Sequence, residues 1–359
     1  MPIISDKMVD MKINNRKIGA NELPYVIAEL SANHGGDLRN ALHLLEKVAE
    51  SGADAFKIQT YTADSMTLNL DTQDFVITEG PWKSRKLYDI YSEGATPYEW
   101  VAPLMKEASK LGIALFSTPF DPKSVDLLES LNVCAFKIAS FELTFDSLLE
   151  RIGATGKPVI LSTGMATKEE ILHALDILTK SGSKSISILK CTTSYPASAK
   201  NLNLIAIPEM IKEFSIPVGF SDHTRDSTAS ISAVALGASI IEKHIKRDDD
   251  DTSLDSSFSM PICEFSGFVS QIRDSFLSRG KPILGATEDE KFYLKYRRSI
   301  IARTEIKKGE VFSDLNITVV RPRIGIAPRY LRDILGKKSE RDIAIGEGIA
   351  EVDLGDSNE

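Results

Sequence analysis

The 359-residue sequence has few cysteines and no long apolar run, and both shortages exclude whole classes of protein. Its three cysteines, Cys134, Cys191 and Cys263, lie far apart and form neither a CxxC metal motif nor an even disulfide framework. We therefore expect a reducing, cytoplasmic location. No apolar stretch approaches the roughly 18 residues that a membrane-spanning helix needs, and the first residues lack the apolar core of a signal peptide.

Positive charge is also in deficit, with 43 Lys and Arg against 51 Asp and Glu. This deficit does not extend to residues 295–349, where basic side chains outnumber acidic ones. A basic tail on an acidic body can be a nucleic-acid-binding appendage. The tail lacks interleaved aromatics and clustered arginines, so we favour a basic lid over an anionic substrate and expect no nucleic-acid partner.

After a polar leader, residues 1–24, the sequence alternates short apolar runs with helix-like segments. The eight runs occupy residues 25–30, 55–59, 113–117, 135–140, 158–163, 185–191, 217–222 and 239–245. Segments such as 38–52 and 96–112 place apolar residues at helical spacing and close with a glycine. Eight β-then-α units in about 250 residues predict an α/β fold, a (β/α)8 TIM barrel. A doubly wound sheet is the alternative, but no glycine-rich dinucleotide fingerprint follows the first run.

The pattern divides the chain into three parts. We expect the barrel over 1–280, a linker over 281–296 and a small domain over 297–359, where short β-prone runs alternate with glycine turns. The small domain repeats the form acidic–Ile–x–x–Gly–Glu–x–apolar at 305–312 and again at 342–349. Two short matches are weak grounds for a duplication, but they predict two similar turns.

One connection, residues 60–95, is too long to be a simple loop between a strand and its helix. Long loops on the catalytic rim of a barrel usually close over the substrate. This one carries Trp82, Tyr88 and Tyr91, which could stack on a sugar. Surface packing of the excursion is an equal alternative for each of these aromatics.

Two of the five histidines, His223 and His244, stand at the ends of consecutive predicted strands. In parallel α/β proteins these C-terminal strand ends form the rim where ligands bind. Two neutral imidazoles on adjacent strand ends can share one divalent cation. For an isolated pair of histidines, two unrelated polar residues would be the better interpretation, so the other strand ends must decide.

Those other strand ends are rich in polar side chains. Lys57 and Lys137 repeat one motif, Phe-Lys-Ile, on two strands, where alternation places each lysine opposite its apolar neighbours. Buried ammonium groups need anionic partners. Glu29 and Glu142 supply carboxylates, and several hydroxyls follow other strands, namely those of Thr118, Ser140, Ser162 and Ser221. The two lysine ammonium groups and the several hydroxyls suit a phosphate. Together with the two histidines and the two glutamates, they predict a reaction at a phosphorylated substrate that a divalent cation assists.

These residues stand in motifs that resemble the sialic acid synthase family along nearly the whole chain. The motifs lie at 27–34, 57–59, 117–120, 136–140, 161–164, 221–224, 242–244 and 320–322. From Arg297 onward the chain resembles the antifreeze-like (SAF) domain, of β-clip type, that ends these synthases. Within the family, the stretches 59–69, 85–88 and 96–100 are most similar to the pseudaminic acid synthases.

The resemblance implies an enzyme that condenses phosphoenolpyruvate with 2,4-diacetamido-2,4,6-trideoxy-altrose. The products would be pseudaminate and phosphate, released by C–O cleavage, and Glu29 or Glu142 would handle the proton transfers. N-acetylneuraminate or legionaminate synthesis by the same chemistry is the runner-up. A metal-dependent aldolase and a non-catalytic polysaccharide-binding protein are more distant alternatives.

The resemblance also implies residue roles and partners. His223 and His244 would bind Mn²⁺ or Mg²⁺. The remaining substrate-binding positions it implies, beyond the lysines and hydroxyls above, are Gln59, Thr193, Tyr195, Asp255 and Arg321. Arg321 would reach across a homodimer, with the SAF domain capping the partner's site. Two positions depart from the neuraminate synthases, because Thr193 replaces an asparagine and Arg323 replaces a glycine.

Overall fold

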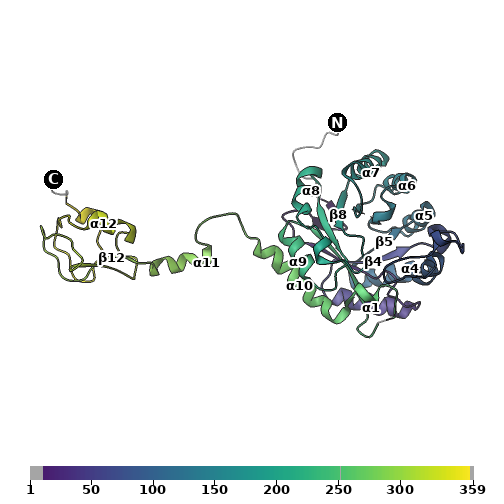
Figure 1. The fold of residues 1–359 in the computed structure, drawn as a ribbon, viewed down its shortest axis with the longest axis horizontal. Helices are drawn as coiled ribbons and strands as arrows, with labels where there is room; N and C mark the ends of the chain where they lie inside the picture. The colour runs from purple at the N-terminus through teal and green to yellow at the C-terminus, as the bar shows by residue number, and fades with distance from the viewer. Residues whose placement is uncertain (1–10, 251, 356–359) are drawn as a thin grey trace. The chain divides into compact units, whose positions relative to one another are not determined.

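The computed structural model describes residues 11–250 and 252–355 of the chain (Figure 1). These fall into two compact units, Met1–Gly280 and Lys281–Glu359, each with its own core. Among the described residues, no helix combines the length and the apolarity that crossing a bilayer requires.

The first unit is a closed barrel of eight parallel strands, as the alternation of the sequence predicts. Its strands are β3 (Tyr25–Glu29), β4 (Ala55–Thr60), β5 (Ala114–Pro119), β6 (Phe136–Ile138), β7 (Val159–Ser162), β8 (Ile186–Cys191), β9 (Val218–Asp222) and β10 (Ile240–Lys246). Each strand pairs with the next in parallel, and β10 pairs with both β9 and β3, which closes the ring. A short strand, β11 (Met260–Pro261), adds to β10.

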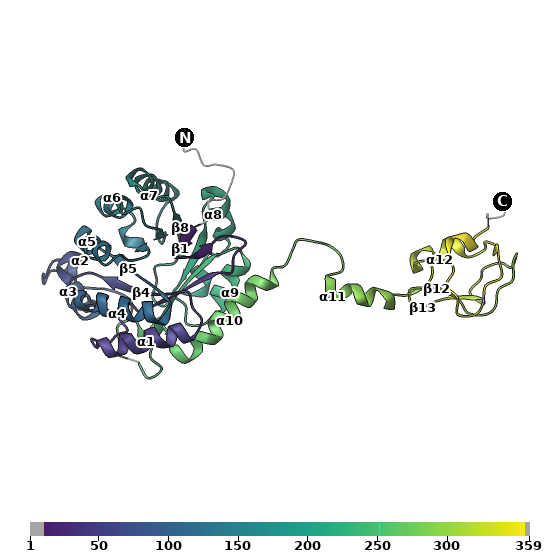
Figure 2. The ribbon, with the colours of Figure 1, turned by 180° about the vertical axis from the view of Figure 1, so that it is seen from behind.

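Helices surround this barrel, as Figure 2 shows from behind. The long ones are α1 (Leu38–Glu50), α4 (Tyr98–Leu111), α5 (Pro122–Ser130), α6 (Asp146–Ala154), α7 (Lys168–Ser181), α8 (Ala206–Phe214), α9 (Thr228–Ala235) and α10 (Ile262–Ser278). Local sequence explains their ends. Thr167 and Glu170 form a capping box at the start of α7, and Gly112 ends α4 with a φ of 73°.

Strand alternation separates two apolar clusters in the barrel unit. Phe56 and Ile58 belong to the larger cluster, between strands and helices, whereas Ala55 belongs to a smaller cluster inside the barrel. Phe116 and Ile160 also line the smaller cluster, near the beginnings of their strands. The apolar interior therefore occupies the N-terminal end of the barrel, and inward-facing residues farther along the strands can be polar.

The described part of the polar leader contains a hairpin that the sequence analysis did not predict. Residues 11–18 form a hairpin of β1 (Met11–Ile13) and β2 (Arg16–Ile18), whose apolar side chains pack onto the smaller cluster. Asn14 takes a φ of 50° at the turn, a conformation that asparagine tolerates. The alternation of Met11, Lys12 and Ile13 is the signal that could have predicted the hairpin. It was missed because each strand is only three residues long, too short for periodicity to stand out.

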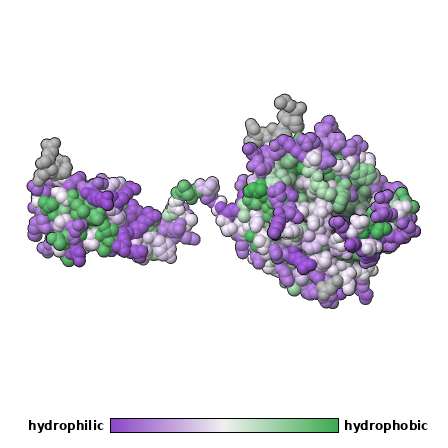
Figure 3. All heavy atoms as spheres, in the orientation of Figure 1, coloured by the Kyte–Doolittle hydropathy of each residue, from purple (hydrophilic) through white to green (hydrophobic). Residues whose placement is uncertain are grey.

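The long connection after β4 is partly helical. It contains α2 (Ala63–Met66), a single 3₁₀ turn η1 (Gln73–Phe75) and α3 (Leu87–Gly94). Thr62 caps α2 through its side chain. Figure 3 shows one face of the barrel unit, on which hydrophilic, intermediate and apolar residues are mixed.

The second unit contains short elements around one small core. They are α11 (Glu288–Lys291), η5 (Phe292–Tyr296), β12 (Ser299–Ala302), β13 (Ile317–Val320), η6 (Pro328–Tyr330), α12 (Leu331–Ile334) and η7 (Glu351–Asp353). The segment 281–296, expected as a linker, holds α11 and η5. β12 and β13 pair antiparallel.

The two repeated segments of this unit form equivalent turns and pair with each other. Ile306 and Ile343 exchange backbone hydrogen bonds of 2.9 and 2.8 Å. Glu310 accepts from the backbone N–H of Lys307, and Glu347 accepts in the same way from that of Ala344. The sequence echo therefore corresponds to a structural one.

Candidate active site

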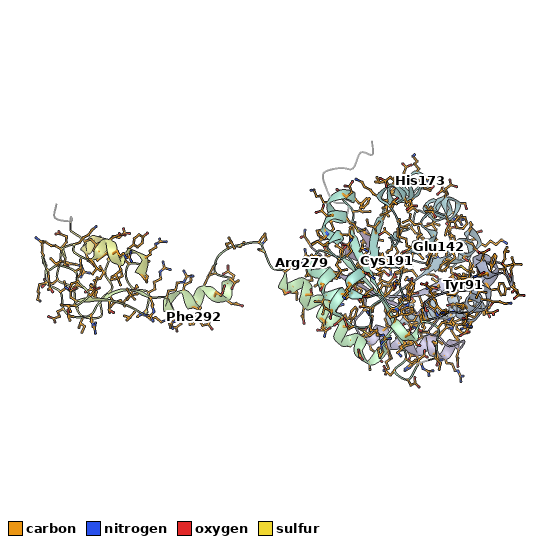
Figure 4. All side chains as sticks on the ribbon, viewed as in Figure 1. Tyr91, Glu142, His173, Cys191, Arg279 and Phe292 are labelled. Carbon is orange, nitrogen blue, oxygen red and sulfur yellow. The ribbon has the colours of Figure 1, made fainter. Side chains whose placement is uncertain are left out.

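A cavity of about 510 Å³ opens at the C-terminal ends of the barrel strands. All sequence-predicted site residues except Arg321 line it, namely Glu29, Lys57, Gln59, Thr118, Lys137, Ser140, Glu142, Ser162, Thr193, Tyr195, Ser221, His223, His244 and Asp255. Figure 4 labels Glu142, Cys191 and Tyr91 among its lining residues. Chain positions more than 200 residues apart meet here because the barrel closes between β10 and β3.

Lys57 and Lys137 point into this cavity, as strand alternation predicts, and both are buried. Lys57 Nζ lies 2.6 Å from a Glu29 oxygen and 3.1 Å from the Thr118 hydroxyl. Lys137 Nζ donates to the Ser162 hydroxyl at 2.7 Å. The predicted anionic partners of the lysines are therefore present, and the nearby hydroxyls extend a polar surface suited to an anion.

Glu242, whose role the sequence reasoning missed, stands between the two lysines. Its carboxylate lies 3.6 Å from Lys57 Nζ and 4.0 Å from Lys137 Nζ, and it accepts from the Ser221 hydroxyl at 3.0 Å. Burial disfavours its charged form, but the two lysines outweigh burial and lower the pKa of Glu242. The signal was its spacing of two residues from His244, which puts both on one strand face.

Glu29 and Glu142 occupy different electrostatic surroundings. Burial raises the pKa of Glu29, while the ion pair with Lys57 opposes that rise. Glu142 ends the 3₁₀ turn η2 (Ser140–Glu142), and burial raises its pKa to about 7, with Lys137 opposing more weakly. One buried oxygen of Glu142 has no hydrogen-bond partner. Glu142 is therefore a carboxyl group whose protonation changes near neutral pH.

The rings of His223 and His244 are neighbours in the cavity wall, with their centroids 5.3 Å apart. His223 Nδ1 lies 3.0 Å from the carbonyl oxygen of Thr192, which sets the ring orientation. Burial is the main cause that holds the pKa of His244 well below its ordinary value, and its buried Nδ1 has no hydrogen-bond partner. A neutral imidazole with an unpartnered nitrogen fits a metal ligand.

The residues of the cavity wall limit the number of ligands that this chain could supply to such a cation. No cluster of three or more His, Cys, Asp or Glu side chains with metal-binding geometry occurs among the described residues. Two imidazoles fit a cation that completes its coordination with substrate oxygens and water, as catalytic sites with open positions do.

Aromatic side chains form another wall of the cavity. The Tyr195 ring lies 4.4 Å from the His223 ring and 5.1 Å from that of Phe258, centroid to centroid. Trp82 lies 5.7 Å from Tyr195 and donates its indole N–H to the Leu254 carbonyl at 2.9 Å. This wall offers apolar area with few polar groups, which suits the carbons of a sugar or its acyl groups.

Asp255 and Gln59 add polar groups beside the aromatic wall. The Ser31 hydroxyl donates to Asp255, and Gln59 donates to both Ser31 and Glu29 at 3.0 Å. Ser31 was missed by the sequence reasoning although it follows the first strand within two residues. Such a chain of hydrogen bonds holds Asp255 and Gln59 in place without a ligand.

Two further predicted positions meet around Gly164. Ser140 accepts from the backbone N–H of Gly164 at 3.0 Å, and the buried Thr193 hydroxyl has no hydrogen-bond partner. A Cβ atom on Gly164 would lie 2.3 Å from the Thr193 oxygen and 2.8 Å from that of Ser140. The glycine is needed here for space. The unpartnered Thr193 hydroxyl is free to bond a ligand.

Arg321 and one aromatic of the long connection, Tyr88, do not line the cavity. Arg321 is an exposed residue of the second unit. Tyr88 does not line the cavity and instead donates to Asp64 at 3.0 Å, whereas Trp82 and Tyr91 from the same connection do line it. Periodicity could not separate these aromatics, because their positions depend on how the connection folds back over the barrel.

Comparisons with known proteins show the family to which this chain belongs. The model of the NeuB family matches residues 44–283, and that of the SAF domain matches residues 297–355. A pseudaminic acid synthase of Campylobacter jejuni is 40% identical over 344 residues, 96% of this chain and 100% of that protein. An N,N'-diacetyllegionaminic acid synthase of the same species is 37% identical over 329 residues, 91% of this chain and 98% of that protein.

A solved structure shows the same fold. The crystal structure of an N-acetylneuraminic acid synthetase from Leptospira borgpetersenii, in complex with citrate, superposes with a TM-score of 0.72. The two sequences are 29% identical, and the match covers 81% of this chain and 97% of the Leptospira chain. With its barrel, its C-terminal SAF domain and these relatives, the chain belongs to the NeuB family, the sialic acid synthases, and is an enzyme.

Proposed function

We propose that this enzyme is a pseudaminic acid synthase, which condenses phosphoenolpyruvate with 2,4-diacetamido-2,4,6-trideoxy-altrose and releases phosphate. The observation that carries the proposal is the cavity itself, where two buried lysines and a row of hydroxyls adjoin an aromatic wall. Relatives that carry this name at 40% identity over 96% of the chain support the choice of sugar.

Phosphoenolpyruvate would bind at the cationic end of the cavity. Lys57 and Lys137 would neutralise its phosphate and carboxylate, and the hydroxyls of Thr118 and Ser162 already contact these lysines at 3.1 and 2.7 Å. Thr193 would donate its unpartnered hydroxyl where the neuraminate synthases have an amide. Because these donors are held in place before binding, they need little rearrangement during the reaction.

The sugar would bind between the aromatic wall and the histidines. Asp255 and Gln59, held by Ser31, would accept from or donate to its polar groups. Tyr195 and Trp82 would contact its apolar parts. His223 and His244 would hold Mn²⁺ or Mg²⁺, and such a cation, when bound, polarises the sugar aldehyde.

Bond formation would join C3 of phosphoenolpyruvate to C1 of the open-chain sugar. The positive character left at C2 is taken up by water, and Glu142 accepts the proton of that water. The tetrahedral carbon then expels phosphate with cleavage of its C–O bond, and the C2 hydroxyl becomes the keto oxygen as its proton leaves on the phosphate. The proton held by Glu142 passes to the former aldehyde oxygen, which becomes a hydroxyl. We assign the base role to Glu142 rather than Glu29, because Glu29 is tied to Lys57 at 2.6 Å while burial gives Glu142 a pKa of about 7.

The proposal also includes a cytoplasmic homodimer. Arg321, in the SAF domain, would complete the site of a second copy and contact the acyl sugar. Deleting residues 297–359 should then impair use of the sugar far more than binding of phosphoenolpyruvate. Equal loss of both would contradict this role of the SAF domain.

The deciding experiment compares initial rates on three sugars, each with phosphoenolpyruvate and Mn²⁺. The sugars are the altrose derivative above and the hexosamine precursors of legionaminate and of N-acetylneuraminate. We expect the highest kcat/KM for the altrose derivative. A preference for either other sugar would assign the runner-up function, for which the relative 37% identical to this chain is the supporting observation. Turnover without phosphate release would point to an aldolase.

A further inference from the structure

Behind the two histidines, on the outer face of the barrel wall, Asp222 and Lys243 form an ion pair that solvent does not reach. Lys243 Nζ lies 3.1 Å from Asp222 Oδ2, and both side chains are 0% exposed. The two residues are direct partners in the register of β9 and β10. Each immediately precedes one of the histidines, so alternation directs the pair outward and His244 into the cavity.

The hydrogen bonds of this pair are complete. Asp222 Oδ1 accepts from the backbone N–H and the hydroxyl of Thr224, both at 2.8 Å. Asp222 Oδ2 accepts from Ser230 at 2.6 Å as well as from Lys243. Lys243 donates further to the carbonyl oxygens of Thr224 and, at 3.0 Å, of Asp226. All three ammonium protons and both carboxylate oxygens therefore have partners.

These contacts enclose His223. The chain before it is held through Asp222 and the chain after it through the carbonyls of Thr224 and Asp226, all bound to Lys243 of the neighbouring strand. Because Lys243 adjoins His244, one ammonium group links the backbones of both histidines. Buried ion pairs are weak as sources of stability, but their directional bonds can specify a single arrangement.

We propose that Asp222 and Lys243 are positioning residues, which set the separation and orientation of His223 and His244 for a shared divalent cation. The inference rests on the cation site of the proposed function. Partners that hydrogen-bond the rings of metal-binding histidines typically contribute about 10–100-fold to metal affinity. Asp222 and Lys243 would act on the same ring orientation through the backbone that carries both histidines. Neither residue touches the cavity, so neither should affect phosphoenolpyruvate directly.

The test measures Mn²⁺ binding to the full-length protein without substrates, from the loss of the electron paramagnetic resonance signal of free Mn²⁺. The main variant is the double substitution Asp222→Asn and Lys243→Met, which removes both charges and leaves no unpaired one buried. We expect its Kd for Mn²⁺ to rise about 10–100-fold. Its Kd for phosphoenolpyruvate, measured by calorimetry without metal, should stay within twofold, and raised Mn²⁺ should restore much of kcat.

A milder variant keeps the test decisive if the double variant does not fold. Ser230→Ala removes one donor to Asp222 from α9 and leaves the ion pair, so a several-fold rise in the Kd for Mn²⁺ is expected. The control is Arg16→Met, which breaks the pair between Arg16, in the N-terminal hairpin, and Asp54, 3.2 Å apart. It should lower the melting temperature and leave Mn²⁺ binding unchanged.

Two outcomes would overturn the inference, and they are distinguishable. If His223→Ala abolishes Mn²⁺ binding but Ser230→Ala and any folded double variant bind as the wild type does, the pair is only structural. If His223→Ala leaves Mn²⁺ binding unchanged, the histidines hold no cation. The metal part of the proposed function then fails, and the positioning role fails with it.

Discussion

Lys57 Nζ lies 2.6 Å from Glu29 Oε2 in the floor of the cavity, and the two side chains are 4% and 1% exposed. A second carboxylate, that of Glu242, lies 3.6 Å from the same ammonium group. Before any substrate arrives, the lysine is therefore already satisfied by acids. An incoming phosphate or carboxylate must share Lys57 with these two glutamates. Substrate binding should therefore depend strongly on the ion pair between Lys57 and Glu29.

Substitution of this lysine should separate catalysis from folding. Lys57→Met leaves the buried carboxylate of Glu29 without its cationic partner, so we expect a loss of about 3–5 kcal/mol in the free energy of unfolding. We also expect kcat/KM for phosphoenolpyruvate to fall by about 10²–10³-fold or more. The double variant Lys57→Met with Glu29→Gln should recover stability but not activity, by calorimetry and steady-state kinetics. An active double variant would show that Lys57 serves only to neutralise Glu29.

The pH profile should report Glu142. As a base it acts when deprotonated, so kcat/KM should fall as the pH drops below about 7, the pKa that burial gives it. Glu142→Gln should lose most of the activity. Its residual kcat/KM should no longer fall as the pH drops below about 7, so the acidic limb of the profile should disappear. Glu29→Gln is the matched comparison, and a limb that disappears there instead would transfer the base role to Glu29.

The same shift predicts the effect of Glu142 on stability. Its pKa is raised in the folded state, so the neutral carboxyl stabilises the fold fully below the unfolded pKa, and this contribution is lost as the pH rises through about 7. Glu142→Gln should therefore be more stable than the wild type at pH 8, by about 1–3 kcal/mol, and nearly equal at pH 4. Denaturant unfolding at both pH values measures the difference, and an equal difference at both would contradict the pKa shift.

Removal of the cation should stop turnover. After chelation of metals we expect the wild type to lose activity and regain it with Mn²⁺ or Mg²⁺. His223→Ala should stay folded, because its partner across the wall is another ring rather than a buried charge, and should remain nearly inactive at any metal concentration. Wild-type turnover by His223→Ala after chelation would remove the metal from the mechanism.

Gly164 offers a test of the space around the hydroxyls. Gly164→Ala would push against Thr193 and Ser140, with oxygen atoms 2.3 and 2.8 Å from the new Cβ. We expect KM for phosphoenolpyruvate to rise at least tenfold while the protein stays folded. Gly267→Ala, in α10, is the control, because its Cβ would meet nothing within 4 Å and should stabilise the helix by about 0.5–1 kcal/mol. An unchanged KM in Gly164→Ala would place phosphoenolpyruvate elsewhere.

Much of the barrel follows from local pattern. Runs such as 55–59 and 217–222 combine apolar residues with turn signals on both sides, and β4 and β9 lie where those runs predict. Alternation also predicts that Lys57 faces inward. The hairpin at 11–18 escaped because its strands are too short for periodicity, and because its apolar residues gain their meaning only from the barrel interior that they cover.

The sequence predicted a set of side chains that line one cavity, but not their contacts with one another. Nothing local shows that Glu242 stands between two lysines, since those lie more than 100 positions earlier in the chain. The same holds for Lys243, an apparently ordinary strand lysine whose ammonium group bonds the loop after His223. These relations depend on strand register and on closure of the ring.

The sequence by itself determined which residues face the inside of the barrel and which stand at the strand ends, because side-chain direction in a strand depends only on position along it. Only the tertiary structure decided which of them touch. Closure of β10 on β3 brings His244 level with Glu29. Burial in the closed barrel then lowers the pKa of His244 and raises that of Glu29. Contacts and pKa values depend on neighbours that the chain meets only after it has closed.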